Sequence, residues 1–383
     1  MKLIIKIGKV ALTFFIGIML LLGLGYAICP IYQYPPAKAF SGDKLYNPYA
    51  QLNGKWFKAN FQVQSYCWLG LTNGRNSIEE VVARYKKLGY DIITISDYQR
   101  INKLSGLNVN YIPVYEHGYN IWKRHQVCIG ARGIIWFDFP LFQWTQQKQF
   151  ILNLLKKKTD FVAIAHPKLL HAYSAKDMRK LAGYDGIEVL NHFRTSDWLW
   201  DAALSAGRAV WILGDDDSHN VDDPNQTGVC WTMINAPSLK EKNILASLRM
   251  GRAYGVKGKN ALNDNGVKRV DVNNNLITVE CDSVASEILF IGQGGKIRKI
   301  AYNTNHASYL FTPEDTYIRI KIVSPKTKIY LNPIFRYNGG EIPRPQAEVD
   351  QTKTWGMRLC FALGYGAIGC LGVKRILQKR KCC

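Results

Sequence analysis

Short apolar runs that alternate with helical segments constrain the fold of this chain more than any other feature. The apolar runs are rich in β-branched and aromatic residues, and they recur at 57–63, 91–95, 111–114, 126–130, 161–165, 186–190 and 209–213. Segments typical of helices lie among them, at 77–88, 146–155, 175–181 and 197–205. Strand and helix in this order predict an α/β fold over residues 55–258, as a parallel sheet or a barrel covered by helices.

Three helix starts carry a capping signature, a serine followed three residues later by an acid. In such a cap the serine oxygen accepts a backbone N–H, and the acid reaches back to the backbone of the serine. The predicted pairs are Ser77 with Glu80, Ser174 with Asp177, and Ser238 with Glu241.

The pattern changes from about residue 260. Gly, Asn and Asp interrupt the chain there, and alternating runs recur at turn spacing between 277 and 331. We therefore predict a small antiparallel β domain, a sandwich or a sheet, over residues 264–337. Residues 338–355 include two prolines and are predicted to be a linker.

An uncharged apolar run from Val10 to Ile28 approaches the length that spans a hydrocarbon core. We predict a transmembrane anchor over residues 1–29. A cleaved signal peptide is the alternative, but Tyr26 and Ile28 are bulkier than the small residues that processing sites need.

A second uncharged run, Leu359 to Val373, precedes a basic tail, so residues 356–383 are predicted to contain another transmembrane helix. Lys and Arg flank the outer ends of both runs, and the positive-inside rule then places both termini in the cytoplasm. The protein would be anchored in the inner membrane. After a linker over residues 30–54, its main part would face the periplasm or exterior.

The formal net charge of +21 favours anionic partners. Eight of the basic residues lie outside the two apolar runs at the chain ends, which leaves about +13 for the rest. Phosphate esters, lipid headgroups and nucleic acid all fit this charge, although no motif supports nucleic acid. A basic solubilising surface is the alternative. The nine cysteines form no spaced framework. Most of them, such as Cys128, Cys230 and Cys281, lie singly in apolar contexts and are predicted to be small buried hydrophobes, with Cys382 and Cys383 unexplained.

Acids and imidazoles stand where the predicted strands end. The run that closes at Leu213 is followed by Asp217 and His219, whose oxygen and nitrogen suit one divalent cation. Other strand ends carry Glu116, His166 and Glu188, and His125 stands at a strand start. The carboxyl ends of parallel neighbours share one rim, so these side chains are expected to converge there. Solvated turns and capping residues are the structural alternative.

These residues resemble the PHP family, the polymerase and histidinol phosphatase superfamily of metal-dependent phosphoesterases, over most of 56–256. The likeness rests on five segments: 58–65, 88–98, 165–167, 185–191 and 217–219. It implies a distorted (β/α)7 barrel with a metal cluster at its carboxyl rim, and the following β domain resembles an accessory domain of some members.

The chain departs from the family at the first metal ligands. Gln62 and Gln64 stand where the family has His-x-His, Asn73 where it has an acid, and Tyr98 where it has a histidine. Amides bind transition metals poorly, and tyrosine must first lose its proton. The resemblance therefore implies fewer ions than the family's usual three, as zinc, manganese or iron.

By resemblance, Glu116, His125 and His166 would hold one ion, with Asp217 and His219 left from the other positions. The catalytic candidates are Asp217, His219 and Glu188. We predict a membrane-anchored phosphoesterase scaffold with a partly degenerate metal site and reduced activity.

Two alternatives remain open. One is a non-catalytic envelope protein that binds a phosphorylated or other anionic ligand. The other uses the β domain to dock a polymer or a protein. Four tryptophans are candidates for an aromatic ligand platform, although aromatic side chains are usually core residues: Trp68, Trp122, Trp136 and Trp144.

Overall fold

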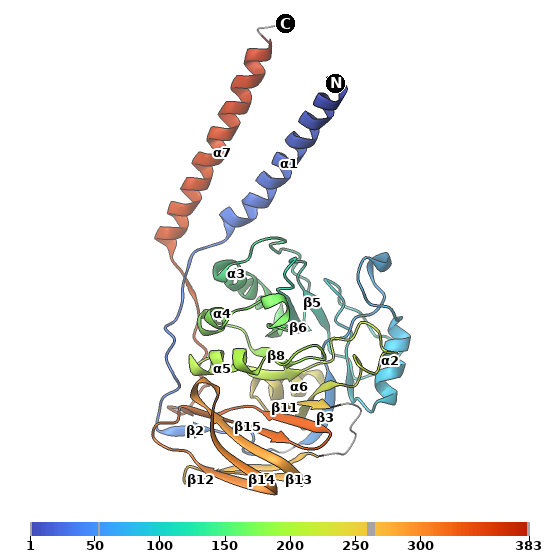
Figure 1. Ribbon diagram of the computed structural model, residues 1–383, viewed down its shortest axis with the longest axis vertical. Coiled ribbons are helices and arrows are strands. Elements are labelled where there is room, and N and C mark those ends of the chain that lie inside the picture. The colour runs from blue at the N-terminus through green and yellow to red at the C-terminus, as the bar shows by residue number, and fades with distance from the viewer. Residues whose placement is uncertain (1, 53, 259–264, 381–383) are drawn as a thin grey trace.

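Two long helices rise side by side from one end of a folded body (Figure 1). The computed structural model describes residues 2–52, 54–258 and 265–380. The helices are α1, Lys2–Ile28, and α7, Gln351–Arg380. Among the described helices, the segment Ile5–Ile28 of α1 is long and apolar enough to cross a membrane. The predicted second span lies in α7 and stays a prediction, and Cys382 and Cys383 lie outside the described residues.

A five-stranded sheet occupies the half of the body nearest α1, in the order β5-β6-β7-β8-β9. Its strands are β5 (Val114–His117), β6 (Gln126–Ala131), β7 (Thr159–Ile164), β8 (Gly186–Leu190) and β9 (Trp211–Gly214). The pairs β7–β8 and β8–β9 are parallel, as predicted, but β6 runs antiparallel to both of its neighbours. The expectation of parallel neighbours throughout is therefore wrong at β6.

An eleven-stranded sheet joins the first strands of the body to the C-terminal strands. Its central path is β12-β13-β15-β16-β11-β10-β3-β4, with β14, β17 and β2 attached at the side. The strands of the path are β3 (Lys55–Asn60), β4 (Ile92–Ile93), β10 (Cys230–Ala236), β11 (Ala253–Gly258), β12 (Val267–Asn273), β13 (Leu276–Gly292), β15 (Tyr317–Val323) and β16 (Thr327–Leu331). Because β16 pairs with β11, one continuous sheet crosses the predicted domain boundary at 258–264.

The predicted C-terminal β region contains strands and a short 3-10 turn, η3 (Gln293–Gly295), in its described residues. The first of the alternating runs predicted from residue 277 onward form one long strand, β13, which pairs with β14 (Lys296–Leu310). This pair lies at the end of the body farthest from α1 (Figure 1).

The predicted linkers form short strands that tie the two ends of the chain together. In the first linker, β1 (Tyr32–Gln33) pairs with β18 (Glu348–Val349) of the second, and β2 (Lys44–Tyr46) pairs with β17 (Ile334–Tyr337). The bases of α1 and α7 are therefore held together by backbone hydrogen bonds.

The helices confirm most of the predicted positions. They are α2 (Ile78–Lys87), α3 (Thr145–Leu155), α4 (Ala175–Lys180), α5 (Asp197–Ser205) and α6 (Glu241–Arg249), with 3-10 turns η1 (Trp68–Gly70) and η2 (Leu169–His171).

Two of the three predicted caps are confirmed. Ser77 and Ser174 form capping boxes at α2 and α4. The third is wrong, because α6 has Lys240 at its N-cap and Ser238 lies two residues before it. The Ser238 hydroxyl instead accepts hydrogen bonds from the Lys240 backbone and the Asn243 amide.

Candidate metal site

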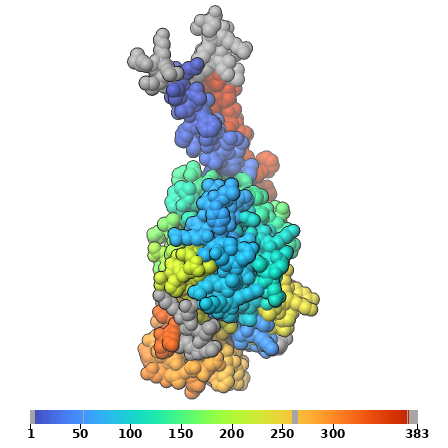
Figure 2. Space-filling view, turned by 90° about the vertical axis from the view of Figure 1, so that its right-hand side faces the viewer, coloured from blue at the N-terminus to red at the C-terminus, as the bar shows by residue number. Residues whose placement is uncertain are grey.

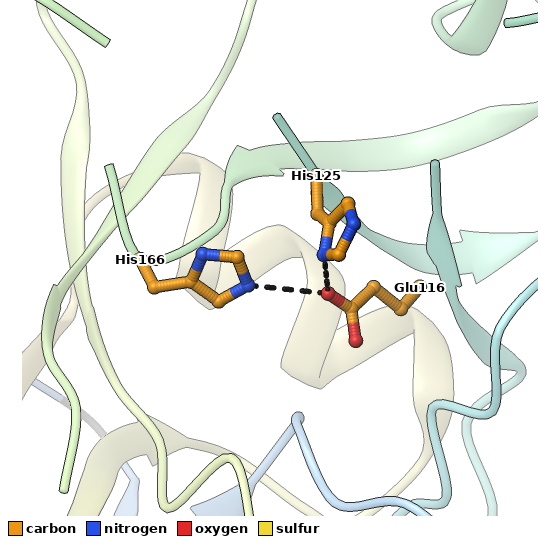
Figure 3. Close-up of side chains that lie close together, drawn as sticks. All are labelled: Glu116, His125 and His166. Carbon is orange, nitrogen blue, oxygen red and sulfur yellow. Dashed lines mark hydrogen bonds and ion pairs between the residues drawn. The ribbon is translucent and has the colours of Figure 1, made fainter. Parts of the chain in front are cut away.

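Three buried side chains, Glu116, His125 and His166, meet at one rim of the five-stranded sheet (Figure 3). Glu116 Oε1 lies 2.5 Å from His125 Nδ1 and 3.2 Å from His166 Nε2. The three candidate ligand atoms all lie within 4.8 Å of one another. One carboxylate oxygen and two imidazole nitrogens are a donor set that could hold a metal ion, and we call these three residues the Glu116 cluster.

The strand directions explain why these residues converge. Glu116 lies in β5 opposite Val127 of β6, and His166 follows the end of β7. His125 precedes β6, a position that would face the opposite rim in a parallel strand. Because β6 is antiparallel to β5 and β7, its start lies at the same rim as the ends of its neighbours.

Gly118 makes room for the His125 ring. Its backbone φ of +124° is rarely adopted by residues other than glycine. A Cβ added at this position would lie 2.8 Å from His125 Cδ2. We expect any substitution at Gly118 to displace the imidazole.

The charges of the cluster depend on burial and on the neighbouring groups. Burial raises the pKa of Glu116, but the two imidazoles lower it by more, so the net pKa lies below its ordinary value. Burial lowers the pKa of His125. For His166, burial also lowers the pKa, but Glu116 and Asp217 outweigh it and the net shift is upward. The lowered pKa values favour a carboxylate at Glu116 and a neutral imidazole at His125, which are the forms that bind metals, whereas the raised pKa of His166 favours an imidazolium whose proton a metal ion would displace.

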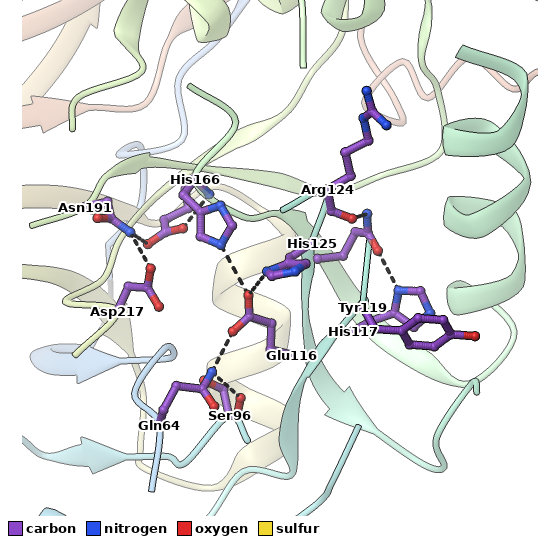
Figure 4. Close-up of polar contacts among 12 residues, drawn as sticks. Gln64, Ser96, Glu116, His117, Tyr119, Arg124, His125, His166, Asn191 and Asp217 are labelled. Carbon is purple, nitrogen blue, oxygen red and sulfur yellow. Dashed lines mark hydrogen bonds and ion pairs between the residues drawn. The ribbon is translucent and has the colours of Figure 1, made fainter. Parts of the chain in front are cut away.

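Two of the four residues that depart from the PHP pattern, Gln64 and Tyr98, contact this cluster. The Gln64 amide donates to Glu116 Oε2 at 2.5 Å and to the Ser96 carbonyl at 2.9 Å (Figure 4). Gln62 is fully buried, and both of its amide atoms lack a hydrogen-bond partner among the described residues. The Tyr98 ring packs edge-on against His125 at 5.2 Å, and burial raises the pKa of the Tyr98 hydroxyl well above its ordinary value, so it stays protonated. Asn73 is exposed.

A second carboxylate group lies beside the cluster. The backbone N–H of His166 donates to Glu188 at 2.6 Å, and the Asn191 amide donates to Glu188 at 2.9 Å and to Asp217 at 3.1 Å (Figure 4). Burial and the Asp217 charge raise the pKa of Glu188 well above its ordinary value. His166 and Asp217 both have positive φ, +26° and +50°, and such backbone strain often occurs at functional sites.

Contrary to expectation, the structure does not bring Asp217 and His219 together as ligands of one cation. Among the described residues, the group that could hold a metal contains neither of them. Asp217 Oδ1 and His219 Nε2 are buried without a hydrogen-bond partner in that part of the chain. The reason is that the backbone N–H of Asp217 bonds to the Gln62 carbonyl, which turns its carboxylate toward Asn191.

Sequence reasoning missed His192. It directly follows Asn191 at the end of β8, its Nδ1 contacts the Asp216 carbonyl at 2.5 Å, and its Nε2 is buried without a partner among the described groups. Its position just beyond a strand end is the same signal that identified His166. By contrast, His117 bonds through both ring nitrogens, to Gln126 and to the Phe137 carbonyl, and is structural.

A scan against protein-family models and a search of curated proteins find no match. Among solved structures, the chain is similar to a two-domain protein from Bacteroides vulgatus that contains a predicted PHP-like metal-dependent phosphoesterase. The identity is 13% and the TM-score 0.39, over 82% of this chain and 98% of that one. The similarity is distant.

Proposed function

We propose that this chain is a membrane-anchored hydrolase of phosphate esters that uses one divalent cation at Glu116, His125 and His166. The convergence of three buried ligand atoms within 4.8 Å carries the proposal. Two imidazoles and one carboxylate are the protein ligands of many catalytic zinc sites, which keep a position open for water or substrate. Zinc fits best, with manganese or iron as the other candidates.

A seven-stranded barrel would place this site at its carboxyl rim. Isolated parallel bridges support closure, since Tyr98 after β4 pairs with Glu116 of β5, and Val63 after β3 pairs with Ser218 after β9. Together with the pairing of β3 with β4, these bridges link β3 through β9 into a ring. We propose residues 55–258 as this barrel and 264–337 as a β domain packed beneath it.

When bound, the cation would polarise a phosphoryl oxygen and lower the pKa of a water molecule. Asp217, with Oδ1 free, accepts a proton from the attacking water. Glu188, whose pKa is raised, holds the proton that passes to the leaving alcohol. His219 Nε2 donates to a phosphoryl oxygen. Water adds to phosphorus, the ester P–O bond breaks, and the products are the alcohol and phosphate.

Gln62 and Gln64 support the proposal that turnover is low. The Gln64 amide already occupies Glu116 Oε2, and neither amide supplies a ligand for a second ion that would stabilise the leaving oxygen. The unpaired amide of Gln62 also favours a second candidate, a binding protein, because it offers both a donor and an acceptor to a polar ligand.

The proposed membrane orientation follows from the basic residues that flank the two apolar runs. With α1 in the membrane and both termini cytoplasmic, the body would face the periplasm or exterior. Phosphate esters or other anionic ligands in that compartment are the proposed partners.

The test is hydrolysis of p-nitrophenyl phosphate by the zinc-loaded full chain, with His166→Gln and Asp217→Asn as variants. We expect each variant to lose about a hundredfold or more of the activity. His306→Gln, which changes an exposed histidine on β14, is the matched control and should keep the parent's rate. Equal activity in all four proteins would contradict the proposal, and bound zinc without turnover would favour the binding protein.

A further inference from the structure

A pocket of about 720 Å³ opens beside the Glu116 cluster, and its walls are largely apolar. His125 and Tyr98 belong to its lining, so the pocket leads to the cluster. The Trp68 and Trp136 rings stand 6.0 Å apart at its mouth, edge to face, and the Trp68 indole donates to the Tyr98 carbonyl at 2.8 Å. The site is therefore reached through an aromatic entrance.

Apolar side chains around this entrance project into solvent. Leu69 and Leu71 are 94% and 88% exposed, and Trp136 and Ile121 are more than half exposed. We call these four residues and Trp68 the aromatic rim. Trp68 and Leu69 both have positive φ, +52° and +55°, so the backbone holds them outward in a costly conformation. A contiguous exposed apolar patch usually marks an interaction site.

The segment that carries Trp136 is attached to the end of α1. The Tyr26 hydroxyl in the last turns of α1 donates to the Phe142 carbonyl at 2.8 Å, and its ring packs against Phe139 and Trp144 at 5.1 and 6.2 Å. Phe142 and Trp144 are themselves exposed and stacked. The apolar helix therefore continues into an exposed aromatic surface, the arrangement seen where proteins meet the membrane interface.

The figures place the chain segments that line the entrance at this end of the body. In Figure 1 the light-blue segment before α2 and the teal segments around β5 and β6 lie at the end from which α1 and α7 rise. Figure 2 shows the light-blue segment at the same end from a second direction. A bilayer that contains α1 would therefore face the aromatic rim.

Positive charge accompanies the rim. Lys123 lines the pocket, with Nζ 5.7 Å from the centre of the Tyr98 ring. Next to it, the Arg124 guanidinium lies 5.0 Å from the Trp122 ring. Basic groups beside exposed aromatic rings suit a phosphate at the depth of lipid headgroups.

We propose that the ligand of this site is an amphiphilic phosphate ester, a phospholipid drawn from the bilayer in which α1 lies. Its apolar chain would lie against the aromatic rim, and its phosphate would pass Lys123 to reach His125. The inference rests on the proposed function for the phosphate chemistry and adds the apolar chain. It accounts for why a pocket that leads to a buried polar cluster is surrounded by exposed leucine and tryptophan.

The test compares two ligands with the same headgroup, dioctanoyl phosphatidic acid and glycerol 3-phosphate. Binding to the full chain in phosphatidylcholine nanodiscs is measured by calorimetry, with empty discs as the baseline. We expect the lipid to bind at least about tenfold more tightly, because burying two methylenes already gives about that factor. The double variant Leu69→Gln, Leu71→Gln, which removes the apolar surface without adding charge, should lose this preference and keep the affinity for glycerol 3-phosphate. Both side chains are almost fully exposed, so the variant should fold.

Val284→Gln is the matched control, an exposed apolar residue of β13 at the far end of the body, and it should keep the preference. Equal affinities for the two ligands, binding of neither, or a preference that survives in the double variant would overturn the inference. If the lipid preference holds but the chain binds no zinc, then the proposed hydrolase fails and lipid recognition stands.

Discussion

Two buried carboxylates of this chain, Asp216 and Glu116, differ in how completely the polar groups around them are hydrogen-bonded within the protein. Asp216 accepts hydrogen bonds from the backbone N–H groups of Gly228, Val229 and Cys230 and from the Tyr85 hydroxyl, all at 2.7 to 2.8 Å. These four hydrogen-bond donors to Asp216 are groups of the protein, so no ligand is needed to complete its hydrogen bonds. Asp216 therefore fixes the loop before β10 against α2, which is a structural role.

The surroundings of Glu116 are incomplete by comparison. Its partners Gln64 and His166 each have a polar atom, Oε1 and Nδ1, without a hydrogen-bond partner within the described chain. The same holds for Gln62 Nε2 and Oε1 and for Asp217 Oδ1, and the Asp217 backbone N–H bonds to the Gln62 carbonyl. An unpaired buried polar group costs about 1–3 kcal/mol, so a cluster that leaves several unpaired is unfavourable unless a ligand completes it. The contrast separates a carboxylate used for folding from one available for binding.

The largest effect is expected at Asp216. Asp216→Ala should destabilise the fold by at least about 3 kcal/mol, because it leaves three backbone N–H groups and a tyrosine hydroxyl buried without an acceptor. Thermal unfolding of the full chain in detergent should show a midpoint lower by on the order of 10 °C. Glu116→Ala, measured with chelator present, should cost clearly less. Equal losses for the two variants would remove the contrast.

A pH dependence should come from Asp177, another carboxylate whose partners are supplied by the chain. Burial raises its pKa, but Lys148, 2.7 Å away, and the hydrogen bonds of the α4 cap lower it by more, so the folded pKa lies below the ordinary value. A lowered folded pKa stabilises the protein above the unfolded pKa, and this contribution is lost as the pH falls through the folded value.

Asp177→Asn should therefore cost about 2 kcal/mol between about pH 7 and pH 5, and the difference from the parent should shrink in more acidic buffer. Thermal midpoints of the two proteins across this range provide the measurement. Asp43→Asn, at an exposed position, is the control. A difference that stays constant down to acid pH would show that the Asp177 charge does not matter.

The smallest effect has the opposite sign. Gln62→Met should stabilise the chelator-treated protein by about 1 kcal/mol, because it removes an amide that is buried without partners. The matched control is Gln126→Met. The Gln126 amide is equally buried but bonds to His117, to the Arg124 carbonyl and to the Tyr173 hydroxyl, so its loss should destabilise. Destabilisation by both variants would mean that Gln62 is already paired.

Local patterns predicted much of the fold. The bounds of β8 and α5 match the prediction, and the caps at Ser77 and Ser174 depend only on residues three positions apart. The direction of β6 could not be read in this way, because an apolar run does not record which way its neighbours run. The continuous sheet through β11 and β16 depends on pairing between segments far apart in the sequence, so it could not be predicted from local patterns either.

The candidate site was likewise predictable only where the local sequence decides the position of a residue. Strand ends identified Glu116 and His166, and the antiparallel β6 explains why His125 joins them. The side-chain direction of Asp217 follows from contacts with Gln62 and Asn191, which are far away in the sequence. The tryptophans also departed from expectation: Trp68, Trp136 and Trp144 are exposed rather than core, because their segments lie at the end of the body that carries α1.

Metal content of the purified full chain is the decisive measurement for the proposed zinc site. After incubation with zinc and removal of excess ion, the parent should retain about one zinc per chain, since the proposed site at the Glu116 cluster would hold one ion. His166→Gln and Glu116→Gln should retain much less, and His306→Gln should match the parent. A parent that retains no zinc, or variants that retain as much as the parent, would contradict the account.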